Sequence, residues 1–208
     1  MCDSVKPVMA VCRRVIDADN SCLFNSIGFL LLNTRSKSSE LRAIVRYITM
    51  QSPEIYSEAV LSKPPSEYAV WIMKDSTWGG EMEVAVLAQY FKVQIAVVDI
   101  RTSNVYIYGS ESTTESRIFL LYDGMHYDAL VKSPSPDTET DSDIKIFSPH
   151  DEEMHLSCQA FSKTQKFVDL VGFDLKCLVC GAGLIGLYGA QSHSKSTGHA
   201  NFGQIQKL

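Results

Sequence analysis

The sequence has no apolar run long enough to cross a membrane. Its densest apolar segment, residues 28–32, is far shorter than the roughly 20 residues that a membrane-spanning helix needs. The first residues also lack the apolar core of a secretory signal peptide. We therefore expect a soluble intracellular protein that lies in the cytoplasm, with the nucleus as an alternative.

The chain also lacks an excess of positive charge. It has 19 Lys and Arg residues against 24 Asp and Glu residues, so its formal net charge is −5. Because nucleic-acid binding depends on clustered positive charge, we expect no nucleic-acid partner. Acidic residues gather in residues 137–153, and we expect that segment to be a solvated loop.

The cysteines are too few and too irregularly spaced for a disulfide-rich secreted fold. The six lie at positions 2, 12, 22, 158, 177 and 180. In an intracellular protein we expect them to be reduced, so each cysteine needs its own explanation. A chain of 208 residues with 45% apolar content is sufficient for one domain of ordinary size and a small appendage.

The apolar pattern changes from helical to strand-like along the chain. Helical spacing predicts helices over residues 22–32, from 38 to about 52, around 55–61, from 64 and over 81–91. Short β-branched runs predict strands at residues 11–16, 93–98, 105–108, 118–122 and 127–131. This order predicts an α/β fold of the α+β type, in which helices flank a mixed sheet.

The composition shifts after residue 131. Residues 132–149 are rich in Ser, Pro and Asp and predict a linker or loop with one strand at 144–147. Residues 152–171 predict a connecting helix, and a second module begins near Phe173. We expect three regions, over residues 9–132, 133–172 and 173–208.

A cysteine stands where a polar turn meets an apolar helical run, in residues 19–24 (DNSCLF). At the start of a helix, Cys22 faces backbone N–H groups and the positive end of the helix dipole, which favour the nucleophilic thiolate. The same turn can direct N–H groups at a developing oxyanion.

A histidine follows about a hundred residues later, in residues 123–128 (DGMHYD). His126 lies on a predicted turn, and Asp128 follows two residues on. A cysteine, a histidine and an orienting acid are the side chains that a thiol hydrolase uses. The alternative is that Cys22 is a small buried apolar residue and His126 a hydrogen-bonded core residue.

Two cysteines and two histidines near the C-terminus have the spacing C-x2-C-x12-H-x5-H. They are Cys177, Cys180, His193 and His199. Zn²⁺ accepts two thiolates and two imidazoles in a tetrahedron, and this spacing fits a β-hairpin followed by a helix. The sequence therefore predicts a structural zinc finger, whereas His150, His155 and Cys158 lie outside the pattern.

The predicted finger carries little positive charge. Lys195 is the only basic residue between the two histidines, whereas DNA-reading fingers occur in arrays with basic helices. We expect the finger to bind protein or to stabilise its own fold. Phe173 and Leu184 are the expected residues of its small core.

Four separated motifs resemble the ovarian-tumour (OTU) family of deubiquitinases. Residues 15–24 (VIDADNSCLF) resemble the Cys loop of that family, and residues 123–128 resemble its His loop. Residues 78–83 (WGGEME) resemble its variable loop and the following helix. The C-terminal two-Cys, two-His cluster indicates the Otu-one-like subgroup, and the resemblance extends over about residues 13–202.

The resemblance implies a thiol-dependent deubiquitinase that hydrolyses isopeptide bonds in ubiquitin chains or conjugates through an acyl-enzyme on Cys22. In this family His126 would be the general base and later the general acid, oriented by Asp128. Asp19 belongs to the family's catalytic set, and we interpret its role as shaping the loop that carries the oxyanion-hole N–H groups. No cofactor is implied for catalysis, and Zn²⁺ would be structural in the finger.

The extended C-terminal tail of ubiquitin would need a narrow channel at the scissile bond. The candidates for the channel walls are Trp78, Gly79 and Gly80, with core packing as the alternative for Trp78. Tyr127, next to the histidine, is expected to shield the site from water. Glu81 and Glu83 are expected on a solvated helix face, with contact to the basic surface of ubiquitin as the alternative.

The implied partners are ubiquitin and polyubiquitin chains, and we expect a monomer. Members of the subgroup often carry an N-terminal ubiquitin-like adaptor domain that recruits the AAA segregase ATPase. Only about a dozen residues precede the Cys loop here, so segregase recruitment stays an open alternative. The alternative to an enzyme is a non-catalytic zinc-finger adaptor that binds ubiquitin or another protein.

Overall fold

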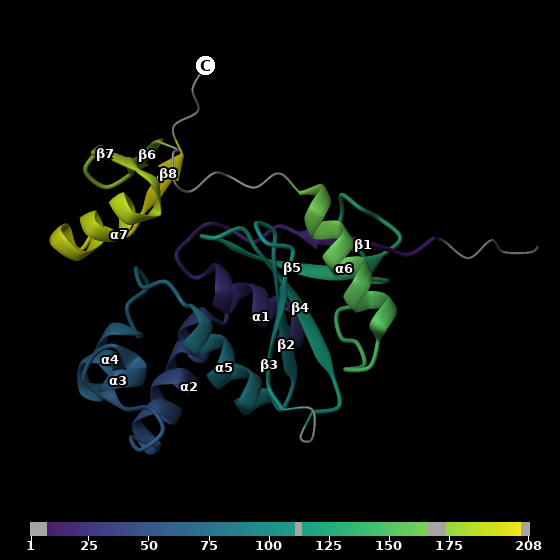
Figure 1. The fold of residues 1–208 in the computed structure, drawn as a ribbon, viewed down its shortest axis with the longest axis horizontal. Coiled ribbons are helices and arrows are strands. Elements are labelled where there is room, and N and C mark those ends of the chain that lie inside the picture. The colour runs from purple at the N-terminus through teal and green to yellow at the C-terminus, as the bar shows by residue number, and fades with distance from the viewer. Residues whose placement is uncertain (1–7, 111–113, 166–173, 205–208) are drawn as a thin grey trace, which may run out of the picture.

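A five-stranded mixed sheet forms the centre of the larger part of the molecule (Figure 1). The computed structural model describes residues 8–110, 114–165 and 174–204. The strands are β1 (Ala10–Arg14), β2 (Gln94–Asp99), β3 (Val105–Tyr108), β4 (Arg117–Tyr122) and β5 (Tyr127–Ser133), in the order β1-β5-β4-β2-β3. Strands β2 and β4 run parallel, whereas the other pairs are antiparallel. The predicted mixed sheet is therefore confirmed.

Among its described residues, this part of the chain has six helices. They are α1 (Cys22–Leu32), α2 (Ser38–Gln51), α3 (Glu58–Leu61), α4 (Pro65–Trp71), α5 (Glu81–Phe91) and α6 (Glu152–Thr164). Helices α1 and α5 contact the sheet, and α2 packs against both of them, as Figure 1 shows. Helix α6 lies across β1 and β2 on the opposite face. Helices on both faces agree with the predicted α+β class.

Alternating residues of the central strands enter two separate cores. In β2, Ile95 and Val97 belong to the core shared with α1, α2, α4 and α5. Ala96 and Val98 belong to the core that contains Met154 of α6. Because both faces of β2 are covered, all six of its residues are buried.

Three predicted elements differ from the structure. The strand expected at 144–147 is two isolated bridges, since Ile144 pairs with β5 and Phe147 pairs with β4. The helix expected at 55–61 is only α3, because Ser57 is extended (ψ 168°) and the helix begins after it. Helix α6 ends at Thr164, before an extended Gln165, and the predicted remainder lies outside the described residues.

The C-terminal part forms a small three-stranded sheet and one helix. Its elements are β6 (Asp174–Cys177), β7 (Gly183–Ile185), α7 (Gly186–Thr197) and β8 (Phe202–Gln204). Leu175 and Ala190 are buried between them. Leu184 is only half-buried, so the expectation that it is a core residue is corrected, whereas Phe173 lies outside the described residues and stays a prediction. In Figure 1 this part lies on the same side of the molecule as α3 and α4.

No helix among the residues that the structure describes is both long enough and apolar enough to cross a bilayer. The longest of them, α2, has 14 residues and carries the charged residues Glu40, Arg42 and Arg46.

The acidic segment before α6 is not wholly a solvated loop. The carboxylate of Asp143 accepts hydrogen bonds from Arg14 Nε (2.7 Å) and Nη2 (2.9 Å), and both side chains are almost completely buried. Ser133 Oγ and Thr140 Oγ1 also donate to it, at 2.6 and 2.9 Å. Burial disfavours the charge, but these hydrogen bonds outweigh it and lower the pKa of Asp143 to about 2. The expectation of solvation is therefore wrong for Asp143.

Replacing Asp143 should destabilise the fold strongly. Asp143→Ala leaves the Arg14 guanidinium buried without its anion, so we expect the free energy of unfolding at pH 7 to fall by about 3–5 kcal/mol. Because the pKa of Asp143 is depressed, the difference from wild type should be full above about pH 4 and shrink as the pH falls toward 2. Urea unfolding measures both effects, and Asp141→Ala, an exposed neighbour, is the matched control.

Candidate active site and metal cluster

The start of α1 leaves backbone N–H groups available beside a thiol. Asn20 has a left-handed backbone (φ 64°), Ser21 is the N-cap residue, and Cys22 is the first helical residue. The Ser21 hydroxyl does not cap the helix and instead accepts a hydrogen bond from Arg42 Nη2 at 3.1 Å. Since no side chain caps the first turn, its N–H groups can stabilise a thiolate or an oxyanion.

Asp19 joins the turn before α1 to the first turn of that helix. One carboxylate oxygen accepts from the Ser21 N–H and the other from Asn25 Nδ2, both at 2.9 Å. Asp19 therefore lies where it can hold the turn in shape. Its part in catalysis stays a prediction.

A short turn between β4 and β5 holds His126. Asp123 Oδ1 accepts from the N–H groups of Met125 (2.9 Å) and His126 (2.7 Å). Gly124 has φ 104°, a conformation that favours glycine, and its carbonyl accepts from the Tyr122 hydroxyl at 2.6 Å. These contacts fix the histidine at the beginning of β5.

The structure brings Cys22, His126 and Asp128 together. His126 Nε2 lies 3.2 Å from Asp128 Oδ1, and the Cys22 side chain lies near enough to act on the pKa of the histidine. Burial lowers the pKa of His126, but the hydrogen bond with Asp128 and the interaction with Cys22 outweigh it and raise the pKa to about 10. The imidazolium is thus favoured at neutral pH.

Asp128 is buried and receives hydrogen bonds on both oxygens. Oδ1 accepts from the Ile16 N–H at 2.7 Å, and Oδ2 accepts from Arg13 Nε at 2.7 Å. Burial raises the pKa of Asp128, but the hydrogen bonds from His126 and Ile16 and the charge of Arg13 together lower it. The carboxylate stays ionised and fixed in direction. Arg13 is not among the predicted site residues. The available signal was a charged side chain within a strand of the sheet, which calls for a carboxylate partner.

Arg42 connects the loop before Cys22 to the loop before Trp78. Its side chain is completely buried and donates to the carbonyls of Asn20 (3.2 Å), Ile72 (3.0 Å) and Thr77 (2.7 Å). Burial lowers the pKa of Arg42. Arg42 is not among the predicted site residues either. Its position on the same face of α2 as the apolar residues Leu41 and Val45 was the signal that it is buried.

Residues 78–80 lie against the first turn of α1. Trp78 Nε1 donates to Asn20 Oδ1 at 2.7 Å, so the indole is tied to the loop before the cysteine. A Cβ on Gly79 would lie 2.6 Å from Leu23 Cδ2, which explains why glycine is needed there. At Gly80 a Cβ would meet nothing closer than 3.8 Å. A role of these residues in substrate binding stays a prediction.

Glu83 is buried, so its expected place on a solvated face is wrong. Its carboxylate accepts from the Tyr68 hydroxyl and, at 2.6 Å, from the Gly80 N–H. The acid thus closes the N-terminus of its own helix, as in a capping box. Glu81 is exposed and accepts from a tyrosine hydroxyl of β3.

Tyr127 is buried beside the histidine. Its ring stacks on Tyr122, with centroids 4.5 Å apart and an interplanar angle of 25°. Its carbonyl accepts from the Ser26 hydroxyl of α1 at 3.1 Å, which helps to hold β5 against the helix that carries Cys22. The expected shielding of the site from water stays a prediction.

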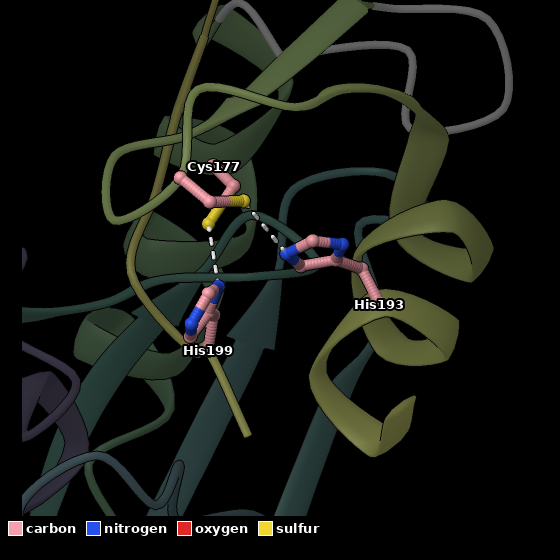
Figure 2. Close-up of side chains that lie close together, drawn as sticks. Cys177, His193 and His199 are labelled. Carbon is pink, nitrogen blue, oxygen red and sulfur yellow. Dashed lines mark hydrogen bonds between the residues drawn. The ribbon is translucent and has the colours of Figure 1, made fainter. Parts of the chain in front are cut away.

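The four predicted metal ligands converge in the C-terminal part, and Figure 2 shows the histidine rings turned toward the sulfur atoms. Cys177 Sγ lies 3.7 Å from His199 Nδ1, and Cys180 Sγ lies 3.4 Å from His193 Nε2. All four ligand atoms are within 4.8 Å of one another. Sulfur and nitrogen on one tetrahedral zinc ion lie about 3.5 Å apart, so this donor set fits Zn²⁺.

Helix α7 supplies only one of the two histidines. It ends at Thr197, where Gly198 (φ 75°) is the C-cap residue, and His199 follows on the segment toward β8. His150, His155 and Cys158 lie outside the cluster, in agreement with the sequence prediction.

Comparisons with known proteins agree with this geometry. Residues 17–130 match the family of OTU-like cysteine proteases, and residues 171–205 match the C-terminal C2H2-type zinc finger of ubiquitin thioesterase OTU1. The chain is 38% identical over 200 residues to OVARIAN TUMOR DOMAIN-containing deubiquitinating enzyme 2 of Arabidopsis thaliana, covering 92% of this chain and 96% of that protein. It is 40% identical to ubiquitin thioesterase OTU1 of Danio rerio, covering 97% of this chain and 68% of that protein.

A solved structure of an OTU domain in complex with ubiquitin is similar as well. It is 26% identical, covers 74% of this chain and 85% of that chain, and superposes with a TM-score of 0.66. The chain therefore belongs to the OTU-like cysteine proteases, in the branch that carries the C-terminal zinc finger of OTU1.

Proposed function

We propose that the protein is a thiol-dependent deubiquitinase that hydrolyses isopeptide bonds in ubiquitin chains or conjugates. The observation that carries the proposal is the contact of Cys22, His126 and Asp128 within an OTU-like fold. Its relatives are named as deubiquitinating enzymes and ubiquitin thioesterases, and a similar domain binds ubiquitin.

The reaction begins with attack of the Cys22 thiolate on the carbonyl carbon of the isopeptide bond. The negative charge that moves to the carbonyl oxygen meets the uncapped N–H groups at the start of α1. His126 then donates its proton to the leaving lysine amine, which frees an amine and leaves a thioester on Cys22. Neutral His126 next takes a proton from water, the hydroxide attacks the thioester, and the thiolate leaves again.

The contacts around Asp128 hold His126 in one orientation throughout this cycle. Asp128 stabilises the imidazolium through Nε2, which leaves Nδ1 for the sulfur and the leaving amine. Arg13 and the Ile16 N–H hold the carboxylate from the other side. Trp78, Gly79 and Gly80 would form one wall of the channel for the ubiquitin tail, since they lie against the start of α1.

The C-terminal cluster would hold one structural Zn²⁺ through Cys177, Cys180, His193 and His199. The distances between the ligand atoms support this assignment. Bound zinc would join the β6–β7 turn to α7 and to the segment before β8, in a module with few buried apolar residues.

The first test asks whether Cys22 is the nucleophile. A ubiquitin probe with a C-terminal electrophile should form a covalent adduct on Cys22, located by peptide mass spectrometry, because the thiolate attacks at the position of the scissile carbonyl. Cys22→Ala should bind ubiquitin chains without cleaving them. An unlabelled wild-type protein would leave only the non-catalytic adaptor, whereas a Cys22→Ala variant with full activity would refute Cys22 as the nucleophile.

The second test concerns the charge on His126. Asp128→Asn removes the carboxylate that raises the pKa of His126, so this pKa should fall from about 10 toward its ordinary value of about 6.5. Because the imidazolium is lost as pH rises through its pKa, the basic limb of kcat should move to lower pH. We also expect kcat to fall by about 10²-fold or more.

The matched control for this test is Asp151→Asn, which makes the same exchange at the N-cap of α6, where asparagine caps as well as aspartate. It should leave the pH profile of kcat unchanged. A basic limb that stays in place in Asp128→Asn would contradict the role assigned to the carboxylate.

The third test removes the metal. Cys180→Ser should lower the zinc content from about one ion per chain toward zero and open the chain after residue 173 to proteolysis. Labelling of Cys22 should persist, because Trp78 is held by Asn20 independently of the finger. Metal analysis and probe labelling measure the two effects, with His150→Ala as the control. Unchanged zinc content in Cys180→Ser would refute the ligand set.

A further inference from the structure

A groove lies between the zinc finger and the segment of the catalytic domain that runs from Trp71 at the end of α4 to Trp78. It has a volume of about 530 Å³. Trp71, Lys74 and Trp78 line it from the catalytic domain, and Ser194 and Lys195 line it from α7. A neighbouring hollow of about 440 Å³ shares Trp71 and Lys74 with it, so the concave surface continues along α4.

The groove is positively charged in an acidic protein. Lys63, Lys74 and Lys195 line it, and none of its lining residues is acidic. Within the described ranges, no ion pair involves any of these three lysines. Glu67 is the one acid of the neighbouring hollow. Three unpaired cations in a chain of net charge −5 indicate an anionic occupant.

The aromatic rings of the groove are already engaged. The ammonium of Lys63 lies 4.3 Å from the centroid of Trp71, and Tyr68 packs against the same ring at 5.5 Å. Trp78 donates to Asn20 and meets Phe202 edge to face, with centroids 6.1 Å apart. Because nucleobases bind single-strand sites by stacking on open rings, these contacts favour a peptide over a nucleic acid.

Trp78 links the groove to the loop before Cys22. Trp78 forms part of the groove wall and is hydrogen-bonded to Asn20, two residues before Cys22. A polypeptide that continues from the scissile lysine would therefore find, beside the loop that precedes Cys22, a cleft whose two walls carry positive charge.

We propose that this groove binds an acidic segment of the protein to which ubiquitin is conjugated, next to the modified lysine. The inference rests on the proposed deubiquitinase function and names the substrate class of that site. One wall of the groove belongs to the finger, so the finger takes part in substrate selection. Lys74 and Lys195 face the bound segment from opposite walls and attract its carboxylates.

The test compares three substrates of the zinc-loaded full chain. Two are ubiquitin joined by an isopeptide bond to the lysine of a synthetic peptide, which carries either glutamates or serines around that lysine. The third is ubiquitin with a fluorogenic amide at its C-terminus, which has no peptide. Wild type should show a KM for the acidic conjugate at least about fivefold below that for the serine conjugate, and added salt should reduce this difference.

Charge reversal on both walls should remove the preference. Lys74→Glu with Lys195→Glu should bring the KM ratio of the two conjugates to about one or below. Hydrolysis of the fluorogenic substrate should stay within about twofold of wild type, since it has no peptide that could reach Lys74 or Lys195. The matched control is Arg46→Glu with Lys163→Glu, an equal change of charge at exposed positions of α2 and α6, and it should keep the preference.

Several results would overturn the proposal. The first is equal KM values for the two conjugates in wild type. The second is an equal loss of activity on all three substrates in Lys74→Glu with Lys195→Glu. The third is loss of the preference for the acidic conjugate in the control variant. An equal loss would mean that the groove contacts ubiquitin itself. Displacement of the bound acidic peptide by a single-stranded oligonucleotide of equal charge would assign the groove to nucleic acid.

Failure of every substrate in wild type would instead refute the proposed function. The groove remains testable in that case by fluorescence anisotropy of the free acidic peptide. Wild type should bind it more tightly than the serine peptide, and Lys74→Glu with Lys195→Glu should abolish the difference. Equal binding of the two peptides would overturn the groove proposal independently of catalysis.

Discussion

The carboxylate of Asp128 is the point at which two distant parts of the chain meet, residues 13–16 and 126–128. It hydrogen-bonds with His126 in the turn before β5, accepts from Ile16 just after β1, and pairs with Arg13 within β1. Because β1 leads directly into the loop before Cys22, the same contacts set the distance between the nucleophile and its base. A buried anion is stable there only because each of its oxygens has partners, so the order of the sheet and the chemistry of the site depend on one group.

Much of this arrangement could be predicted from local signals. The periodicity of residues 22–32 and 81–91 predicted α1 and α5, and the four-residue metal pattern predicted a cluster that the structure brings together. The signals were strong because each depends on spacing within a short segment. Cys22, His126 and Asp128 could be named because each lies in a recognisable loop, although their contact depends on strands β4 and β5 lying beside α1.

The residues that were missed act over long sequence separations. Arg13, Arg14 and Arg42 find their partners in distant segments, and a charge has no periodicity that points to its partner. The bridges of Ile144 and Phe147 were mistaken for a strand for the same reason, since each residue pairs with a different strand. Glu83 was predicted to be exposed but is buried. An acidic residue in the first turn of a helix usually faces water, but here Tyr68 from α4 covers it.

An aromatic contact between Trp78 and Phe202 joins the finger to the catalytic domain. The same indole is hydrogen-bonded to the loop that precedes Cys22. The chain has only two tryptophans, and the ring of Trp71, on α4, is covered by Lys63. The fluorescence of Trp78 can therefore report on its surroundings. Its emission depends on the solvent exposure of the indole. One emission spectrum is therefore sensitive both to the docking of the finger on the catalytic domain and to the conformation of the loop before Cys22.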